Sequence, residues 1–112
     1  MDREDSGGTY VYNGVDAVPD NVRHVRVDPS ITVIRDNAFD GHFHLEEVEL
    51  PEGLLKIGDT AFGECRNLKR INIPSTVKEI DKEAFFECGQ LEGIILPKGL
   101  EQLGKGAFQW CI

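Results

Sequence analysis

Residues 68–90 read LKRINIPSTVKEIDKEAFFECGQ, and this pattern decides the fold because it occurs four times. The other copies occupy residues 22–44, 45–67 and 91–112, the last one residue short. The dipeptide Ala-Phe marks each copy, at Ala38-Phe39, Ala61-Phe62, Ala84-Phe85 and Ala107-Phe108. Aliphatic residues fill the first, fourth, sixth, tenth and thirteenth positions of every copy. A repeat this regular predicts a stack of coils, in which each coil is stable only through its neighbours.

Each copy contains a short strand followed by a turn. Positions four and six share one face of an extended chain and position five lies opposite, which predicts a brief β-strand. Pro51, Pro74 and Pro97 come next and end the pairing, because proline has no N–H to donate. From position 14, stretches such as residues 81–85 predict one or two turns of α- or 3₁₀-helix. Such coils stack with parallel strands about 4.8 Å apart.

A proline after the strand followed by Ala-Phe-x-x-Cys, as in residues 84–88, resembles the BspA-like (type 5) leucine-rich repeat family. The resemblance covers residues 22–112. It implies an α/β solenoid, a right-handed coil stack with a parallel β-sheet on the concave face and short helical or 3₁₀ turns on the convex face. It also implies non-enzymatic binding and transfers no catalytic residue.

The residues before the repeats divide into two parts. Residues 1–8 are expected to be a disordered leader and residues 9–21 an N-terminal cap. Within the cap, residues 9–12 read as a strand that runs into a turn at Asn13-Gly14. We expect the rings of Tyr10 and Tyr12 to cover the open edge of the first coil rather than to stack on a ligand.

Charge and composition exclude several classes of partner. The 112 residues carry 12 Lys plus Arg against 20 Asp plus Glu, a net charge of -8. This balance argues against nucleic acid and against anionic membrane surfaces, which both attract basic proteins. No apolar stretch approaches the roughly 20 residues of a membrane-spanning helix. The N-terminus does not read as a secretory signal and the cysteine count is odd, so a cytoplasmic location with free thiols is expected.

Position 21 of the four copies has the composition of a zinc site, with His42, Cys65, Cys88 and Cys111. Zinc needs four ligands within about 2.0–2.3 Å of one point. Residues at one position of successive coils form a row, and its first and fourth members would lie about 14 Å apart. We therefore expect no metal and no cofactor but a row of buried thiols, with a disulfide between neighbouring coils as the lesser alternative.

Enzyme motifs are missing from the sequence. None of the three serines lies in a Gly-x-Ser-x-Gly elbow. The acidic stretch 46–49 would lie on an open sheet, which offers no desolvation to separate the pKa values of two carboxylates. Residues 104–106 lack the remaining glycines and the Lys-Ser or Lys-Thr of a phosphate loop. We expect no enzymatic activity.

The outward strand positions three and five are the candidate binding surface. We expect contact with a protein partner of unknown identity through this set: Arg26, Glu47, Glu49, Arg70, Asn72 and Ile95. Charges alternate along the neighbouring rows, so they are expected first to compensate one another within the molecule. The alternative function is a structural or adhesin-like repeat array, or a fragment of a longer surface or scaffold protein.

The C-terminal end shows no capping segment in this sequence. A coil without a neighbour exposes apolar edges and unpaired strand groups. Either further repeats follow, or Phe108, Trp110 and Ile112 form an end-to-end interface for self-association.

Overall fold

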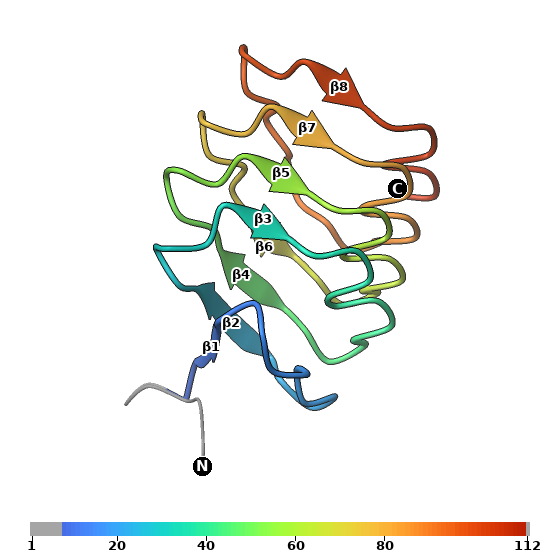
Figure 1. Ribbon diagram of the computed structural model, residues 1–112. Helices are drawn as coiled ribbons and strands as arrows, with labels where there is room; N and C mark the ends of the chain where they lie inside the picture. The colour runs from blue at the N-terminus through green and yellow to red at the C-terminus, as the bar shows by residue number, and fades with distance from the viewer. Residues whose placement is uncertain (1–7, 112) are drawn as a thin grey trace.

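Stacked coils of parallel β-strands form the molecule, and Figure 1 shows them one above another from the N-terminal end to the C-terminal end. The computed structural model describes residues 8–111. Sheet A contains, in spatial order, β1 (Tyr10–Tyr12), β2 (His24–Val27), β4 (Glu47–Glu49) and β6 (Arg70–Ile71). Sheet B contains β3 (Val33–Ile34), β5 (Lys56–Ile57), β7 (Glu79–Ile80) and β8 (Gln102–Leu103).

The strands pair in the register of the repeat. In sheet A, Val25 pairs with Val48, and Val48 pairs with Ile71, so partners lie 23 residues apart. Sheet B keeps the same spacing from Ile34 to Ile57. All these pairs are parallel, which confirms the predicted coil stack and places like residues directly above one another.

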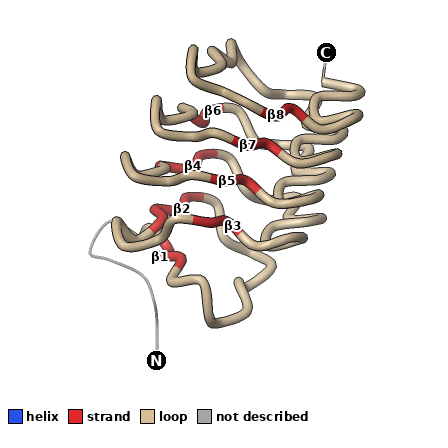
Figure 2. Tube along the Cα trace, turned by 45° about the horizontal axis from the view of Figure 1, so that its top comes forward, coloured by secondary structure: helices blue, strands red, loops and turns tan. Residues whose placement is uncertain are grey.

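Sheet B was not predicted, because the sequence indicated only one strand in each coil. Figure 2 shows strand segments on both sides of the coils. The strands of sheet B are two residues long, and in β3 the exposed Val33 alternates with the fully buried Ile34. Two residues are too few to give a recognisable period-two pattern.

The predicted helical turns are wrong, and with them the α/β class. Residues 8–111 contain no helix, and Figure 2 shows only loops between the strands. Two positions in each coil, the sixteenth and the twentieth, have left-handed backbone conformations. In the third coil these are Glu83, with φ of 56°, and Glu87, with φ of 58°. A right-handed helix cannot pass through a residue in this conformation.

Hydrogen bonds in this turn alternate between two directions. The N–H of Ala61 donates to the oxygen of Gly58 at 3.1 Å, which closes a tight turn within the coil. The next N–H, of Phe62, donates to the oxygen of Ala84 in the following coil at 2.7 Å. Every second backbone donor is thus used to hold two coils together instead of closing a helix.

The predicted strand of the fourth coil, within residues 91–96, does not form. Gly93 has a φ of 37°, outside the extended range. The N–H of Glu92 still donates to the oxygen of Lys69 at 2.9 Å, so this segment remains attached to the third coil.

A stack of aromatic rings runs through the core beneath the turns. The ring of Phe62 lies 5.0 Å from that of Phe39 and 5.2 Å from that of Phe85, with nearly parallel planes. At one end of the stack, the ring of Phe108 lies 5.1 Å from that of Phe85. At the other end, the ring of Tyr12 lies 5.2 Å from that of Phe39. Such pairs contribute about 0.5–1.5 kcal/mol each beyond the burial of their area.

The segment before the repeats covers the first coil through strand β1. Strand β1 pairs with β2, so that Tyr10 lies beside Val25 and Tyr12 beside Val27. Both tyrosines are buried, which confirms their role as a cover over the core. The expected disordered leader lies outside the described residues except for Gly8.

Candidate protein-binding surface

The outer face of sheet A carries the residues expected to bind a partner. Val25, Val48 and Ile71 point into the core, so their neighbours in the strands point outward. The structure leaves all six residues at least partly exposed: Arg26, Glu47, Glu49, Arg70, Asn72 and Ile95.

Ion pairs between neighbouring coils occur on this face, as the alternating charges predicted. A nitrogen of Arg23 lies 3.1 Å from the Glu46 carboxylate. The Nε of Arg70 lies 3.8 Å from the carboxylate of Glu47. These side chains are well exposed, so each pair contributes only about 0–1 kcal/mol to stability.

A hollow of about 380 Å³ lies on this face between the second, third and fourth coils. The outward side chains and the glycine that line it are Glu47, Glu49, Arg70, Asn72, Glu92 and Gly93. The structure thus brings four of the six predicted residues together at one depression. Arg26 and Ile95 do not line it, and Ile95 is 83% exposed.

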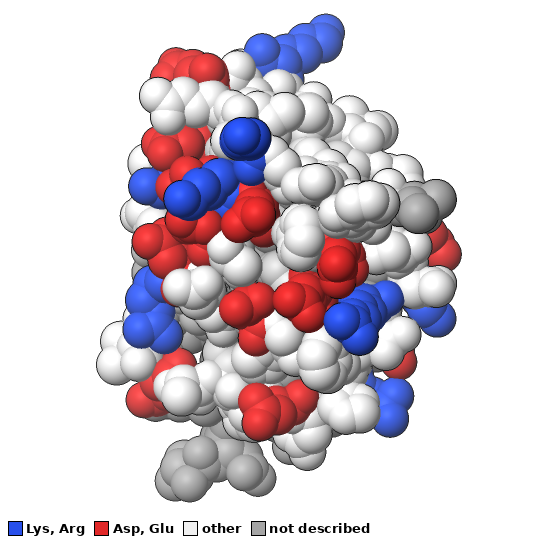
Figure 3. All heavy atoms as spheres, turned by 90° about the vertical axis from the view of Figure 1, so that its right-hand side faces the viewer, with Lys and Arg blue, Asp and Glu red and all other residues white. Residues whose placement is uncertain are grey.

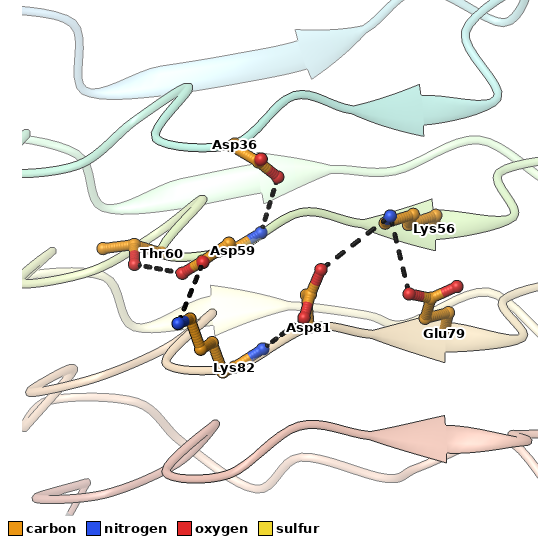
Figure 4. A network of polar contacts seen from close by, with 7 residues as sticks. All are labelled: Asp36, Lys56, Asp59, Thr60, Glu79, Asp81 and Lys82. Carbon is orange, nitrogen blue, oxygen red and sulfur yellow. Dashed lines mark hydrogen bonds and ion pairs between the residues drawn. The ribbon is translucent and has the colours of Figure 1, made fainter.

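A second charged network lies on the sheet B side, and the sequence analysis missed it. Figure 4 shows Lys56 between two carboxylates, with its Nζ 3.5 Å from Glu79 and 3.8 Å from Asp81. In the next row, the Nζ of Lys82 lies 3.9 Å from Asp59. The alternation of Lys56 with Glu79 at position twelve was a signal that could have found this network.

Figure 3 presents the side of the molecule that lies on the right in Figure 1, and charged residues of both signs are interspersed there. Acidic and basic side chains alternate there instead of forming one large acidic area. The net charge of -8 is therefore not expressed as a single-sign field on this face.

The cysteine row is structural. The Cys65 thiol donates a hydrogen bond to the carbonyl oxygen of Phe39 at 3.1 Å, and the Cys88 thiol donates one to the carbonyl oxygen of Phe62 at 3.1 Å. Burial raises the pKa of Cys65 to about 12 and also raises the pKa of Cys88. All three cysteines are free thiols, so the disulfide alternative is wrong for this structure.

Neither metal ligation nor a membrane span has support in the described part of the chain. Residues 8–111 contain no group of three or more His, Cys, Asp or Glu side chains that could hold an ion. At the His42 end of the row, Nε2 lies 3.2 Å from the oxygen of Val18, which ties the cap to the first coil. The same residues include no helix of the length and apolarity needed to cross a bilayer.

The C-terminal coil exposes apolar side chains, and one of them, Leu103, has equivalents that are buried in the inner coils. Leu103 is 49% exposed, whereas Ile80 directly beside it is fully buried. Trp110 is 61% exposed, while Phe108 is partly covered by Phe85. Ile112, the third residue of the predicted end interface, lies outside the described residues.

Comparison with known proteins finds one family and two solved structures. The family described as BspA type Leucine rich repeat region (6 copies) matches residues 18–112. A crystal structure of a leucine-rich repeat protein from Bacteroides ovatus ATCC 8483 is similar with a TM-score of 0.83 and 28% sequence identity. A crystal structure of the T. pallidum leucine rich repeat protein gives a TM-score of 0.61 and 27% identity.

Both similar structures are longer than this chain. The comparison covers 93% of this chain and 29% of the B. ovatus protein, and 90% of this chain and 53% of the T. pallidum protein. A search of curated proteins finds no match.

Proposed function

Because the chain belongs to the BspA-type leucine-rich repeat family, we propose that it is a non-enzymatic module that binds a protein partner through the outer face of sheet A. The observation that carries this proposal is the hollow lined by Glu47, Glu49, Arg70 and Asn72. An extended face with a depression and mixed polar groups suits a protein surface, because charge patterns set register and partner choice.

Capture of a partner from native extract tests the proposal, with the intact chain as bait. Replacement of Glu49 and Arg70 by alanine should reduce binding of the captured protein at least about tenfold, since central contacts dominate interface energies. The matched control replaces Lys78 and Glu101, an exposed base and acid that do not line the hollow. Unchanged binding by the Glu49/Arg70 variant would refute this surface.

The second candidate function is a structural or adhesin-like array, as part of a longer surface or scaffold protein. The length of the two similar structures favours it, since this chain spans only 29% and 53% of them. The exposed Trp110 and Leu103 further support self-association through the C-terminal coil, for which Phe108, Trp110 and Ile112 are the proposed contacts. Light scattering at two concentrations tests this, and a strict monomer at both would count against it.

A further inference from the structure

We infer that the hollow on sheet A receives a basic side chain, an arginine or lysine, that the protein partner presents next to an apolar residue. The inference rests on the proposed function and specifies the chemistry of the partner. It is carried by the shape of the hollow, the balance of charge around it and the apolar residues beside it.

The hollow exists because one row of side chains is interrupted. Position three of successive coils carries Glu47, Arg70 and then Gly93. A Cβ added at Gly93 would meet no other atom within 4 Å, so the space beside Arg70 is open. Its volume of about 380 Å³ lies at the lower end of the roughly 300–1,000 Å³ typical of ligand pockets. A long, flexible side chain from outside can therefore enter where the protein's own side chain is missing.

The charge around the hollow favours a cation. Three carboxylates line it against one guanidinium, and that guanidinium, of Arg70, is already paired with Glu47 at 3.8 Å. Among residues 8–111, Glu49 and Glu92 form no ion pair with a basic side chain. An arginine or lysine in the hollow would lie between two uncompensated carboxylates, whereas an acidic side chain would meet net repulsion.

Elsewhere the same sheets match acids with bases of the neighbouring coil. Lys56 pairs with Glu79 on sheet B, and Arg23 pairs with Glu46 on sheet A. Glu92 follows Lys69 in its row, but within residues 8–111 the two side chains form no ion pair, and Gly93 has no side chain to place beside Arg70. The partner's basic side chain would thus supply the ion pair that the acids of other coils form with bases of this protein.

Apolar residues lie directly after the hollow in the fourth coil. Ile95 is 83% exposed and Leu96 is 39% exposed, although their strand neighbours in other coils are polar or more buried. Burying such side chains on binding contributes about 25 cal/mol per Å² of apolar area. An apolar residue beside the basic one in the partner would cover them.

The test is an NMR titration of the isotope-labelled chain with two capped tetrapeptides, Ac-Gly-Arg-Leu-Gly-NH₂ and its analogue with citrulline, which has the shape of arginine without the charge. The arginine peptide should shift the amide signals of Asn72 and Gly93. The citrulline peptide should bind at least tenfold more weakly. Equal titration by both peptides, or shifts centred elsewhere, would overturn the inference.

Variants with equal charge separate specific binding from general attraction to an acidic protein. The double variant Glu49→Gln with Glu92→Gln should lose at least tenfold in affinity for the arginine peptide. The control, Glu52→Gln with Glu101→Gln, changes the net charge equally at exposed acids outside the hollow and should bind normally. Equal losses of affinity in both variants would refute binding of the arginine side chain in the hollow.

The same variants distinguish this inference from the proposed function. A captured partner that needs Arg70 but is indifferent to Glu49→Gln with Glu92→Gln would leave the binding face in place and refute the basic side chain. If every sheet A variant still bound both the captured partner and the arginine peptide normally, the proposed function and this inference would both be refuted.

Discussion

Each coil contributes one phenylalanine to a continuous stack of rings, and Phe62 contacts a ring on both sides. This side chain is fully buried, so its removal affects the first and third coils together. Phe43, in contrast, lies on the surface with 47% exposure and is covered by the guanidinium of Arg66 at 5.2 Å. Identical side chains therefore have unequal importance that depends on their place in the coil.

Phe62→Ala should lower the free energy of unfolding by about 3–5 kcal/mol, because it leaves a cavity in the ring stack. Urea denaturation followed by circular dichroism measures this. Phe43→Ala is the control and should cost less than about 1 kcal/mol, the scale of an exposed cation–π contact. Similar losses in the two variants would contradict the stacked core.

The buried thiols predict a decline in stability at alkaline pH. The unfolded chain releases a cysteine proton near pH 8.5–9, whereas the raised pKa of Cys65, about 12, keeps that proton bound in the folded state. The folded state then holds more protons than the unfolded state, so stability falls as pH rises from about 9 to 12. The slope is about 1.4 kcal/mol per pH unit for each such thiol.

Urea midpoints measured between pH 8 and 10.5 test this slope, and Cys65→Ala provides the comparison. The variant should show a shallower decline, because one of the linked protons is gone. An unchanged slope would mean that Cys65 is not protected in the folded state.

At the scale of elements, the sequence predicted the coil stack but not the geometry of the turns. Spacing alone located the strands that the first three coils contribute to sheet A, because Val48 and Ile71 must align for the core to close. The turns around Ala61 and Ala84 resemble short helices in composition. Their backbone instead donates hydrogen bonds to the next coil, and such bonds depend on a neighbour that local sequence patterns do not describe.

The left-handed residues give this difference a test. Glu83→Gly should leave stability unchanged or raise it by up to about 1 kcal/mol, because glycine adopts a φ of 56° without steric cost. In a helix the same change would cost about 1 kcal/mol. Thermal unfolding measures the outcome, and Glu79→Gly in strand β7 should be destabilising as the control.

The outward direction of four residues that line the hollow was predictable, but the hollow itself was not. Alternation along the strand indicated that Glu49 and Arg70 face outward. The hollow depends on a missing side chain at Gly93 beside the filled positions of two other coils, which becomes visible only when the coils are stacked.

At the scale of the whole molecule, the hydrogen bonds between the turns of successive coils all have the same direction. On the turn side, Phe62 donates to Ala84 of the coil that follows. On sheet A, by contrast, the parallel pairing uses bonds in both directions, so each strand donates to and accepts from the same neighbour. Among residues 8–111, the turn side of the fourth coil therefore carries backbone donors, at Phe108 and Trp110, that have no acceptor.

Amide hydrogen exchange should show this asymmetry at concentrations where the chain is monomeric. Within the described residues, the N–H groups of Phe108 and Trp110 have no acceptor, whereas those of Phe62 and Glu64 donate at 2.7 and 2.6 Å. We expect the first pair to exchange at least about 100-fold faster than the second. Equal protection in the monomer would contradict the open end.

The 23-residue register also determines which changes in length the protein can accept. Within the repeats, the strand pairs and the stacked phenylalanine rings join residues one unit apart, so gain or loss of a whole unit leaves the remaining contacts intact. An insertion of any other size within a coil would move phenylalanine away from its row. Duplication or deletion of one repeat can therefore lengthen or shorten this molecule in steps of one coil, and each step adds or removes one row of outward side chains.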